Sequence, residues 1–242
     1  NDVVTQIPLK VFGIHLNLTE GKAICNRSRN LIADEQNFFN ISAKKYFLYS
    51  FSKPKKDLKI AIYNEFKSQI EKAISDGLNL SHFDSHEHIH HCPWIFKIIS
   101  DLGKEFKIRR IRFVNEKIVF SNFIKDFYHK FISLNYLKYL IVYINNKKIK
   151  NNFLSTDYFF GILNSGKVNL DELILYLDKI SSNKSIEVCL HPSEEVVNKS
   201  TNKREFYYHL NRKLEKNLIT NDEFKDYLKK EKIKLINFSD IN

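Results

Sequence analysis

The sequence predicts an α/β fold built from parallel strands, and three observations support this fold class. Short apolar runs with a two-residue period alternate along the chain with longer runs of helical period, which is the pattern of βαβ units. A length of 242 residues suits one large domain, and a hydrophobic content of 43% is enough for its core. No repeat, low-complexity segment or linker marks a boundary, so residues 1–242 are expected to form a single domain.

The first half of the chain is expected to contain two strands and two helices. Residues 10–18 alternate apolar and polar side chains, and residues 80–86 do so again. Residues 57–76 carry apolar side chains at the spacing of an amphipathic helix, and a further helix starts with Pro93 in its first turn. Residues 22–56 show no period and are expected to be a long excursion with one short helix.

The second half continues the alternation of strands and helices. Asn169 and Glu172 form a capping pair in front of one of these helices. The expected elements are a strand at 108–113, a helical stretch at 117–150, a short apolar run at 157–163, a helix at 170–180, a strand at 185–191, helices at 203–217 and 221–231, and a closing strand at 234–238.

Composition limits the function classes. The net charge is +11, but the lysines are spread along the whole chain, which favours a solvated basic surface over a nucleic-acid partner. No apolar run is long enough to span a bilayer and no signal pattern opens the chain, so a cytoplasmic protein without a membrane span is expected. Cys25, Cys92 and Cys189 form no CxxC pair, which argues against a disulfide framework or a cysteine-built zinc site.

A dense run of histidines indicates a metal site. Residues 81–94 read SHFDSHEHIHHCPW, and imidazole and carboxylate groups are usual ligands of a catalytic divalent metal. Three predicted strands carry a histidine at or near their carboxyl end, namely His15, His86 and His191. Because the carboxyl ends of parallel strands gather at one edge of a sheet or barrel, these three side chains are expected to converge.

Other polar side chains are expected to support these histidines. A carboxylate beside a ligating imidazole fixes its tautomer, a role that suits a carboxylate next to His86. The supporting or substrate-contacting residues are predicted to be Asp84, His88, Glu187 and Arg112. For Glu187, orientation of His191 and an ion pair with a lysine both stay open, and for Arg112 an ion pair with a buried carboxylate is favoured over an anion or carbonyl contact. His90 and His91 are expected in a solvated loop or at the helix entry.

Three motifs give the chain a family resemblance. They are GIHLNLTEG at 13–21, HFDSHEHIH at 82–90 followed by Pro93, and EVCLHP at 187–192. In this order they resemble the motifs of the YdjC-like carbohydrate deacetylases, which include chitooligosaccharide deacetylases and a hopanoid-associated deacetylase. The resemblance implies a deformed parallel β/α barrel and hydrolysis of the N-acetyl group of an amino sugar or oligosaccharide with one divalent metal ion, Mg or Zn.

The resemblance also implies roles for individual residues. His15 and His86 match two histidine ligands of the metal, and His191 matches a general acid that protonates the leaving amine. The family begins with a strand that carries an Asp-Asp pair, one a ligand and the other the general base, and no such strand precedes these motifs here. Either the printed chain starts roughly fifty residues downstream of the family's start, about one βα unit, or the site is incomplete. A homodimer is left open.

Two other functions fit parts of the pattern. The spacing His86-x-His88-x-His90 resembles the ligand run of metal-dependent phosphoesterases of the polymerase-and-histidinol-phosphatase type. A non-enzymatic protein that binds a sugar or an anion would fit a basic barrel without the aspartate pair. Acetate release, phosphate release and binding without turnover separate the three hypotheses.

Overall fold

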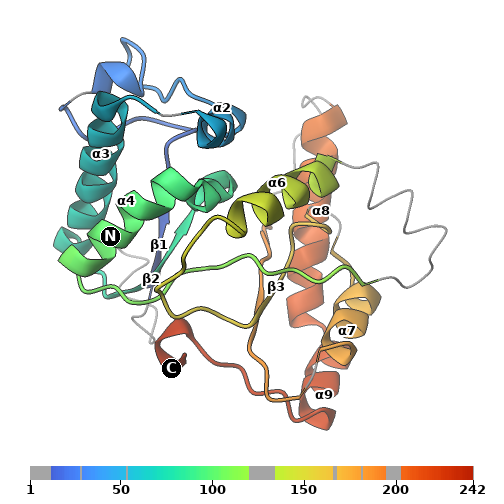
Figure 1. Ribbon diagram of the computed structural model, residues 1–242. Helices are drawn as coiled ribbons and strands as arrows, with labels where there is room; N and C mark the ends of the chain where they lie inside the picture. Colours follow the sequence, from blue (N-terminus) through green and yellow to red (C-terminus); the bar gives the residue numbers. More distant parts are fainter. Residues whose placement is uncertain are drawn as a thin grey trace. The chain divides into compact units, whose positions relative to one another are not determined.

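The computed structural model describes residues 12–27, 29–52, 54–119, 134–165, 168–180, 182–194 and 203–241, and it has a mixed α/β fold (Figure 1). The chain divides into two compact units. The first unit comprises residues 1–112, 141–155 and 237–242, and the second comprises residues 113–140 and 156–236.

The first unit is organised around the parallel strand pair β1 (Phe12–Leu16) and β2 (Leu80–Ser85), which lie side by side in Figure 1. Both strands were predicted, although each is shorter than its apolar pattern. Ile14 and Leu16 are buried while His15 is exposed, so the two-residue period directs the histidine away from the core. In the parallel register His15 lies opposite Asp84.

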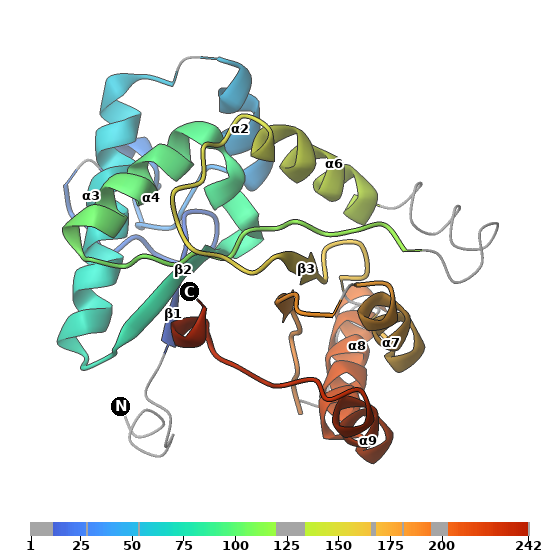
Figure 2. The ribbon, with the colours of Figure 1, turned by 60° about the horizontal axis from the view of Figure 1, so that its bottom comes forward.

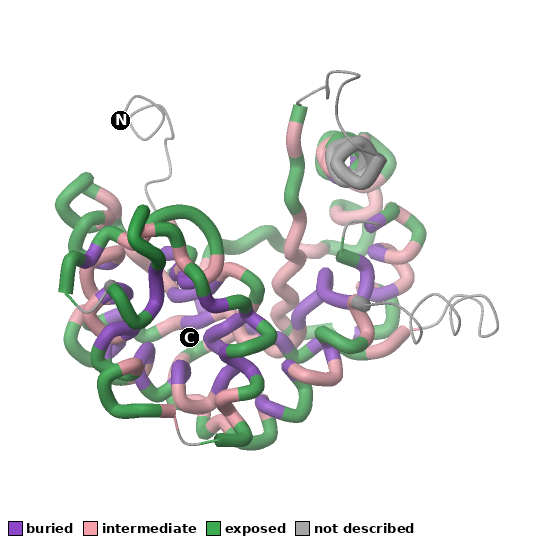
Figure 3. The backbone as a smooth tube through the Cα atoms, turned by 90° about the horizontal axis from the view of Figure 1, so that it is seen from above, coloured by how far each residue is buried: buried purple, intermediate pink, exposed green. Residues whose placement is uncertain are grey.

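Two predicted helices provide most of the apolar surface of the first unit. Helix α3 (Lys56–Ser75) buries its stripe of Ile62, Phe66 and Ile70, and helix α4 (Pro93–Glu105) begins with proline in its first turn. The excursion before α3 contains one α-helix, as expected, and the buried positions are drawn in purple in Figure 3. The shorter elements of this unit are η1 (Arg29–Leu31), α2 (Ala43–Leu48), η2 (Tyr49–Phe51), η3 (His86–His91) and η4 (Phe238–Asp240).

The second unit contains another parallel pair, β3 (Tyr158–Phe160) with β4 (Ile186–Val188), which Figure 2 shows beside helices α7 and α8. Its helices are α7 (Leu170–Asp178), α8 (Lys203–Thr220) and α9 (Asp222–Lys230). Asn169 caps α7 as predicted, because its side chain accepts the backbone N–H of Glu172 at 2.9 Å. The core of this unit is formed by Phe160, Val168, Leu173, Tyr176, Ile180 and Leu218.

Three predicted elements differ from the structure. Residues 233–237 form no strand, and Leu235 is 80% exposed, because this segment pairs with no strand edge among the described residues. Residues 108–113 form only single parallel bridges, at Arg110 and Ile111. Of the helical stretch expected at 117–150, residues 117–119 are not helical, residues 120–133 lie outside the described residues, and α6 (Leu134–Asn146) is helical as predicted.

The strand pairs agree with the predicted parallel α/β class. Each sheet among the described residues has two strands, β1 with β2 and β3 with β4, and neither is closed into a barrel. None of the described helices is long and apolar enough to cross a membrane.

Candidate active site

A pair of histidines stands at the carboxyl end of the first strand pair. His15 lies near the end of β1, and His86 follows the last residue of β2. Their facing ring nitrogens, Nε2 of His15 and Nδ1 of His86, are 3.4 Å apart, and the rings meet edge to face. The structure therefore brings together two of the three histidines that were predicted to converge.

Each histidine of this pair contacts a carboxylate through its other ring nitrogen. His15 Nδ1 lies 2.9 Å from Asp84 Oδ2, and His86 Nε2 lies 3.3 Å from Glu20 Oε2. The prediction that Asp84 supports His86 is therefore wrong, because the parallel register places Asp84 opposite His15 instead. The carboxylate that contacts His86 is Glu20, which the sequence analysis did not single out.

Arg112 holds the inner carboxylate in place. Its Nη1 lies 2.8 Å from Asp84 Oδ2, and both side chains are largely buried, which matches the favoured prediction of an ion pair. Burial alone would raise the pKa of Asp84, but the hydrogen bond from His15 and the charge of Arg112 outweigh it and hold this pKa below its usual value. Asp84 is therefore ionised at neutral pH and accepts the Nδ1 proton of His15.

The facing nitrogens have a spacing that suits a divalent metal. Two nitrogens that each lie about 2.1 Å from a tetrahedral metal are about 3.4 Å apart. His15 Nε2 and His86 Nδ1 show this separation. Among the described residues, no three His, Cys, Asp or Glu side chains are grouped so as to hold a metal ion. The pair thus fits as two nitrogen ligands of a site whose remaining ligands are not among these side chains.

His90 and His91 are buried, contrary to the prediction of a solvated loop or helix entry. His90 Nδ1 bonds Ser85 Oγ at 2.5 Å and His90 Nε2 bonds the carbonyl oxygen of Arg112 at 3.0 Å, while His91 Nδ1 contacts Asn146 Oδ1. Both ring nitrogens of His90 are thereby used. The ligand run proposed for a phosphoesterase is therefore interrupted at this position.

The backbone explains why these histidines turn inward. Glu87 and His88 have φ angles of 52° and 56°, in the left-handed region, so η3 is kinked directly after His86. The ring of His88 lies 6.1 Å from that of His90 and 6.4 Å from that of His91. His88 thus belongs to a histidine cluster beside the His15–His86 pair, and a role toward substrate stays a prediction.

The buried histidines make the stability of the protein sensitive to acid. Burial lowers the pKa of His82 to about 4 and that of His91 to about 3, whereas an unfolded histidine titrates near 6.5. Between these values the unfolded chain binds more protons than the folded one, so stability is complete above about pH 6.5 and falls as the pH drops toward 4.

We expect urea unfolding measured at pH 7.5, 6 and 5 to show this loss. His82→Gln removes one titrating group, so the slope of unfolding free energy against pH should flatten by up to about 1.4 kcal/mol per pH unit between pH 6 and 5. Equal slopes for the two proteins would contradict the burial argument.

His191 lies in the second unit, directly after β4 and close to a buried carboxylate. Its backbone N–H donates to Glu215 Oε2 at 2.6 Å, and its Nδ1 lies 4.0 Å from the same oxygen. The imidazole is 52% exposed and Glu215 is 2% exposed. The sequence analysis expected Glu187 as an orienting carboxylate, and it missed Glu215, which comes from helix α8 about one turn before that helix ends.

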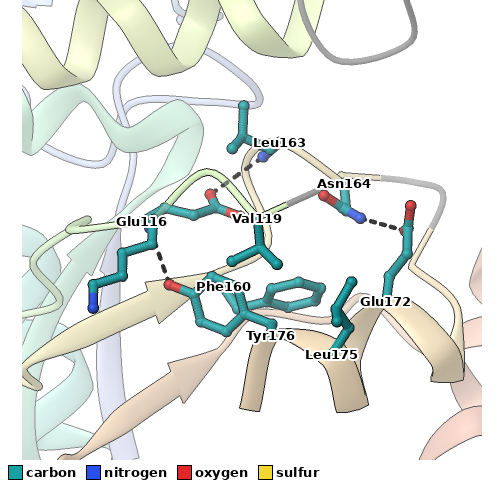
Figure 4. A pocket seen from close by; sticks show the side chains of 9 residues that line it. Glu116, Val119, Phe160, Leu163, Asn164, Glu172, Leu175 and Tyr176 are labelled. Carbon is teal, nitrogen blue, oxygen red and sulfur yellow. Dashed lines mark hydrogen bonds between the residues drawn. The ribbon is translucent and has the colours of Figure 1, made fainter. Parts of the chain in front are cut away.

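The second unit also contains a hollow of about 280 Å³ between the segment after Asn115 and helix α7 (Figure 4). Buried Glu116 accepts the backbone N–H groups of Gly161, Ile162 and Leu163 at 2.8 to 3.2 Å. The Tyr176 hydroxyl accepts the N–H of residue 117 and donates to the carbonyl oxygen of residue 159. These polar groups stabilise the chain around the hollow, so we assign it no ligand.

Fold and site together define a mixed α/β protein with a paired-histidine site on parallel strands. The chain matches the family model described as YdjC-like protein over residues 2–230, so it belongs to the YdjC-like family.

Individual relatives of known description agree with this membership. A carbohydrate deacetylase of Clostridium beijerinckii is 27% identical over 95% of this chain and 77% of its own length. A carbohydrate deacetylase of Vibrio parahaemolyticus is 27% identical over 98% of this chain and 78% of its own length. A crystal structure from Enterococcus faecalis, described as a proposed cellobiose-phosphate cleavage protein, has a TM-score of 0.60 with 18% identity and covers 93% of this chain and 76% of its own.

Proposed function

We propose that this protein is a metal-dependent hydrolase that removes the acetyl group from an N-acetylated amino sugar or oligosaccharide. The observation that carries the proposal is the spacing of 3.4 Å between His15 Nε2 and His86 Nδ1, each ring anchored to a carboxylate by its other nitrogen. Membership in the YdjC-like family and relatives named carbohydrate deacetylases supply the substrate class.

In this proposal His15 and His86 would hold one divalent ion, Mg or Zn. When bound, such an ion polarises the acetyl carbonyl and lowers the pKa of a neighbouring water molecule. Asp84 keeps the proton of His15 on Nδ1, so that its Nε2 lone pair is free for the ion, and Arg112 keeps Asp84 ionised.

His191 is assigned the role of general acid. An amine leaves readily only when it receives a proton, and an imidazolium group supplies one near neutral pH. The exposed imidazole is open to a substrate, and the ionised carboxylate of Glu215 4.0 Å from Nδ1 favours the protonated ring. No general base is assigned to the described residues.

We further propose that the strand pairs belong to a deformed parallel β/α barrel. Both described sheets are parallel, and helices follow β2 and β3 along the chain. In a parallel barrel the catalytic side chains project from the carboxyl ends of the strands, which is where His15, His86 and His191 occur.

The function is tested by incubating the protein with N,N′-diacetylchitobiose after EDTA treatment and then adding Zn²⁺ or Mg²⁺. We expect acetate release to stop on chelation and to return with the metal, without phosphate release from a sugar phosphate. Acetate release that is indifferent to chelation, or metal-dependent phosphate release instead, would reject the proposal.

A further inference from the structure

A second carboxylate mirrors Asp84 across the histidine pair. Asp84 contacts the outer nitrogen of His15, and Glu20 contacts the outer nitrogen of His86 at 3.3 Å. The two histidines come from adjacent strands, whereas Glu20 belongs to the turn after β1. The order of groups is therefore carboxylate, imidazole, imidazole, carboxylate.

This order determines where the imidazole protons lie. A carboxylate only accepts hydrogen bonds, so each neutral imidazole places its proton on the nitrogen that faces its carboxylate. The inner nitrogens, His15 Nε2 and His86 Nδ1, then each present a lone pair, and these lone pairs face each other across 3.4 Å. Two facing lone pairs repel, and a cation between them converts the repulsion into two bonds.

The turn that carries Glu20 is fixed by hydrogen bonds. Asn17 Oδ1 accepts the backbone N–H groups of Thr19 and Glu20 at 3.0 and 3.2 Å, and Asn17 Nδ2 donates to the carbonyl oxygen of Glu20 at 2.6 Å. Gln69 of helix α3 in turn bonds both backbone polar groups of Asn17, at 3.0 and 2.7 Å. The start of the turn is thereby tied to α3.

The end of the same turn is tied to the same helix. Glu65, a fully buried residue of α3, accepts the backbone N–H groups of Ile24 and Cys25 at 3.2 and 2.9 Å. Glu65 also accepts a hydrogen bond from Gln69 at 2.9 Å. Because α3 holds the chain on both sides of Glu20, the position of this carboxylate does not depend on its own exposed side chain alone.

We propose that Glu20 is a positioning residue that keeps the proton of His86 on Nε2 and so commits its Nδ1 to a divalent cation shared with His15 Nε2. This inference deepens the proposed function and rests on it for the identity of the cation. Such outer partners of ligating histidines typically change metal affinity by about 10- to 100-fold, and the exposure of Glu20 places its effect near the lower end.

The test uses the whole chain labelled with ¹⁵N-histidine, first without metal at about pH 8, where histidine is neutral. Long-range ¹H–¹⁵N spectra report which ring nitrogen of His86 carries the proton. We expect protonated Nε2 and bare Nδ1 in the wild type and in Glu20→Gln, whose amide oxygen still accepts, and a mixture of tautomers in Glu20→Ala. On addition of Zn²⁺, the signals of His15 Nε2 and His86 Nδ1 should shift.

Calorimetry with Zn²⁺ gives the second readout. Glu20→Ala should bind about tenfold more weakly than wild type, Glu20→Gln should bind within about twofold, and Glu35→Ala, at an exposed turn position of the same unit, should not differ. A Glu20→Ala protein with wild-type tautomer and affinity overturns the inference. If the wild type binds no Zn²⁺, the metal proposal fails, while the tautomer comparison still decides the role of Glu20.

Discussion

Replacing His15 or His86 by alanine is expected to abolish metal-dependent acetate release from N,N′-diacetylchitobiose. Each substitution removes one of only two nitrogens that stand 3.4 Å apart, and a single imidazole cannot hold the ion in a fixed place. The loss of Zn²⁺ affinity should exceed the roughly 10- to 100-fold typical of outer partners, because a direct ligand is removed. Acetate release and Zn²⁺ calorimetry measure the two effects.

The substitutions are expected to leave the fold intact. The side chains of His15 and His86 are 52% and 33% exposed, so their removal opens no core cavity. Thermal unfolding of the two variants should therefore match that of the wild type, which separates a lost ligand from a lost fold. Full acetate release from either variant would remove both histidines from the proposed metal site.

The local periodicity of the sequence predicted the elements that bury one clear face. Strands β1 and β2 and helices α3 and α4 occur where their apolar spacing placed them, because burial of that spacing is what stabilises each element. The expected strand at 234–238 has the same alternation but remains exposed. A strand forms only beside a partner edge, and the local pattern contains no information about partners.

The candidate site was predictable up to the same limit. The ends of parallel strands correctly suggested that His15 and His86 converge, since this follows from strand direction alone. The partner of Asp84 depended on the register between two strands 70 residues apart in the sequence, which no local pattern reveals. Glu20 and Glu215 were missed for a related reason, because each meets its histidine only through a turn or a helix that tertiary packing positions.

Gly161→Ala is expected to produce the largest loss of stability among substitutions that remove no polar group. Gly161 has a φ of +139°, which side chains rarely adopt, and an added Cβ would lie 2.8 Å from the carbonyl oxygen of Cys189. Cys189 cannot yield easily, because its N–H donates to the carbonyl oxygen of Phe160 at 2.9 Å beside the pair β3–β4. Backbone strain and overlap together should cost about 3 kcal/mol or more in urea unfolding.

Gly77→Ala separates the two causes of this loss. Gly77 also has a left-handed φ, +84°, but an added Cβ would meet no atom within 4 Å, so only the backbone cost of about 1 to 2 kcal/mol is expected there. Because His191 follows Cys189 by two residues, Gly161→Ala should also lower acetate release in the fraction that remains folded, whereas Gly77→Ala should not. Equal unfolding free energies for the two variants would show that the chain at Cys189 yields to the added methyl group.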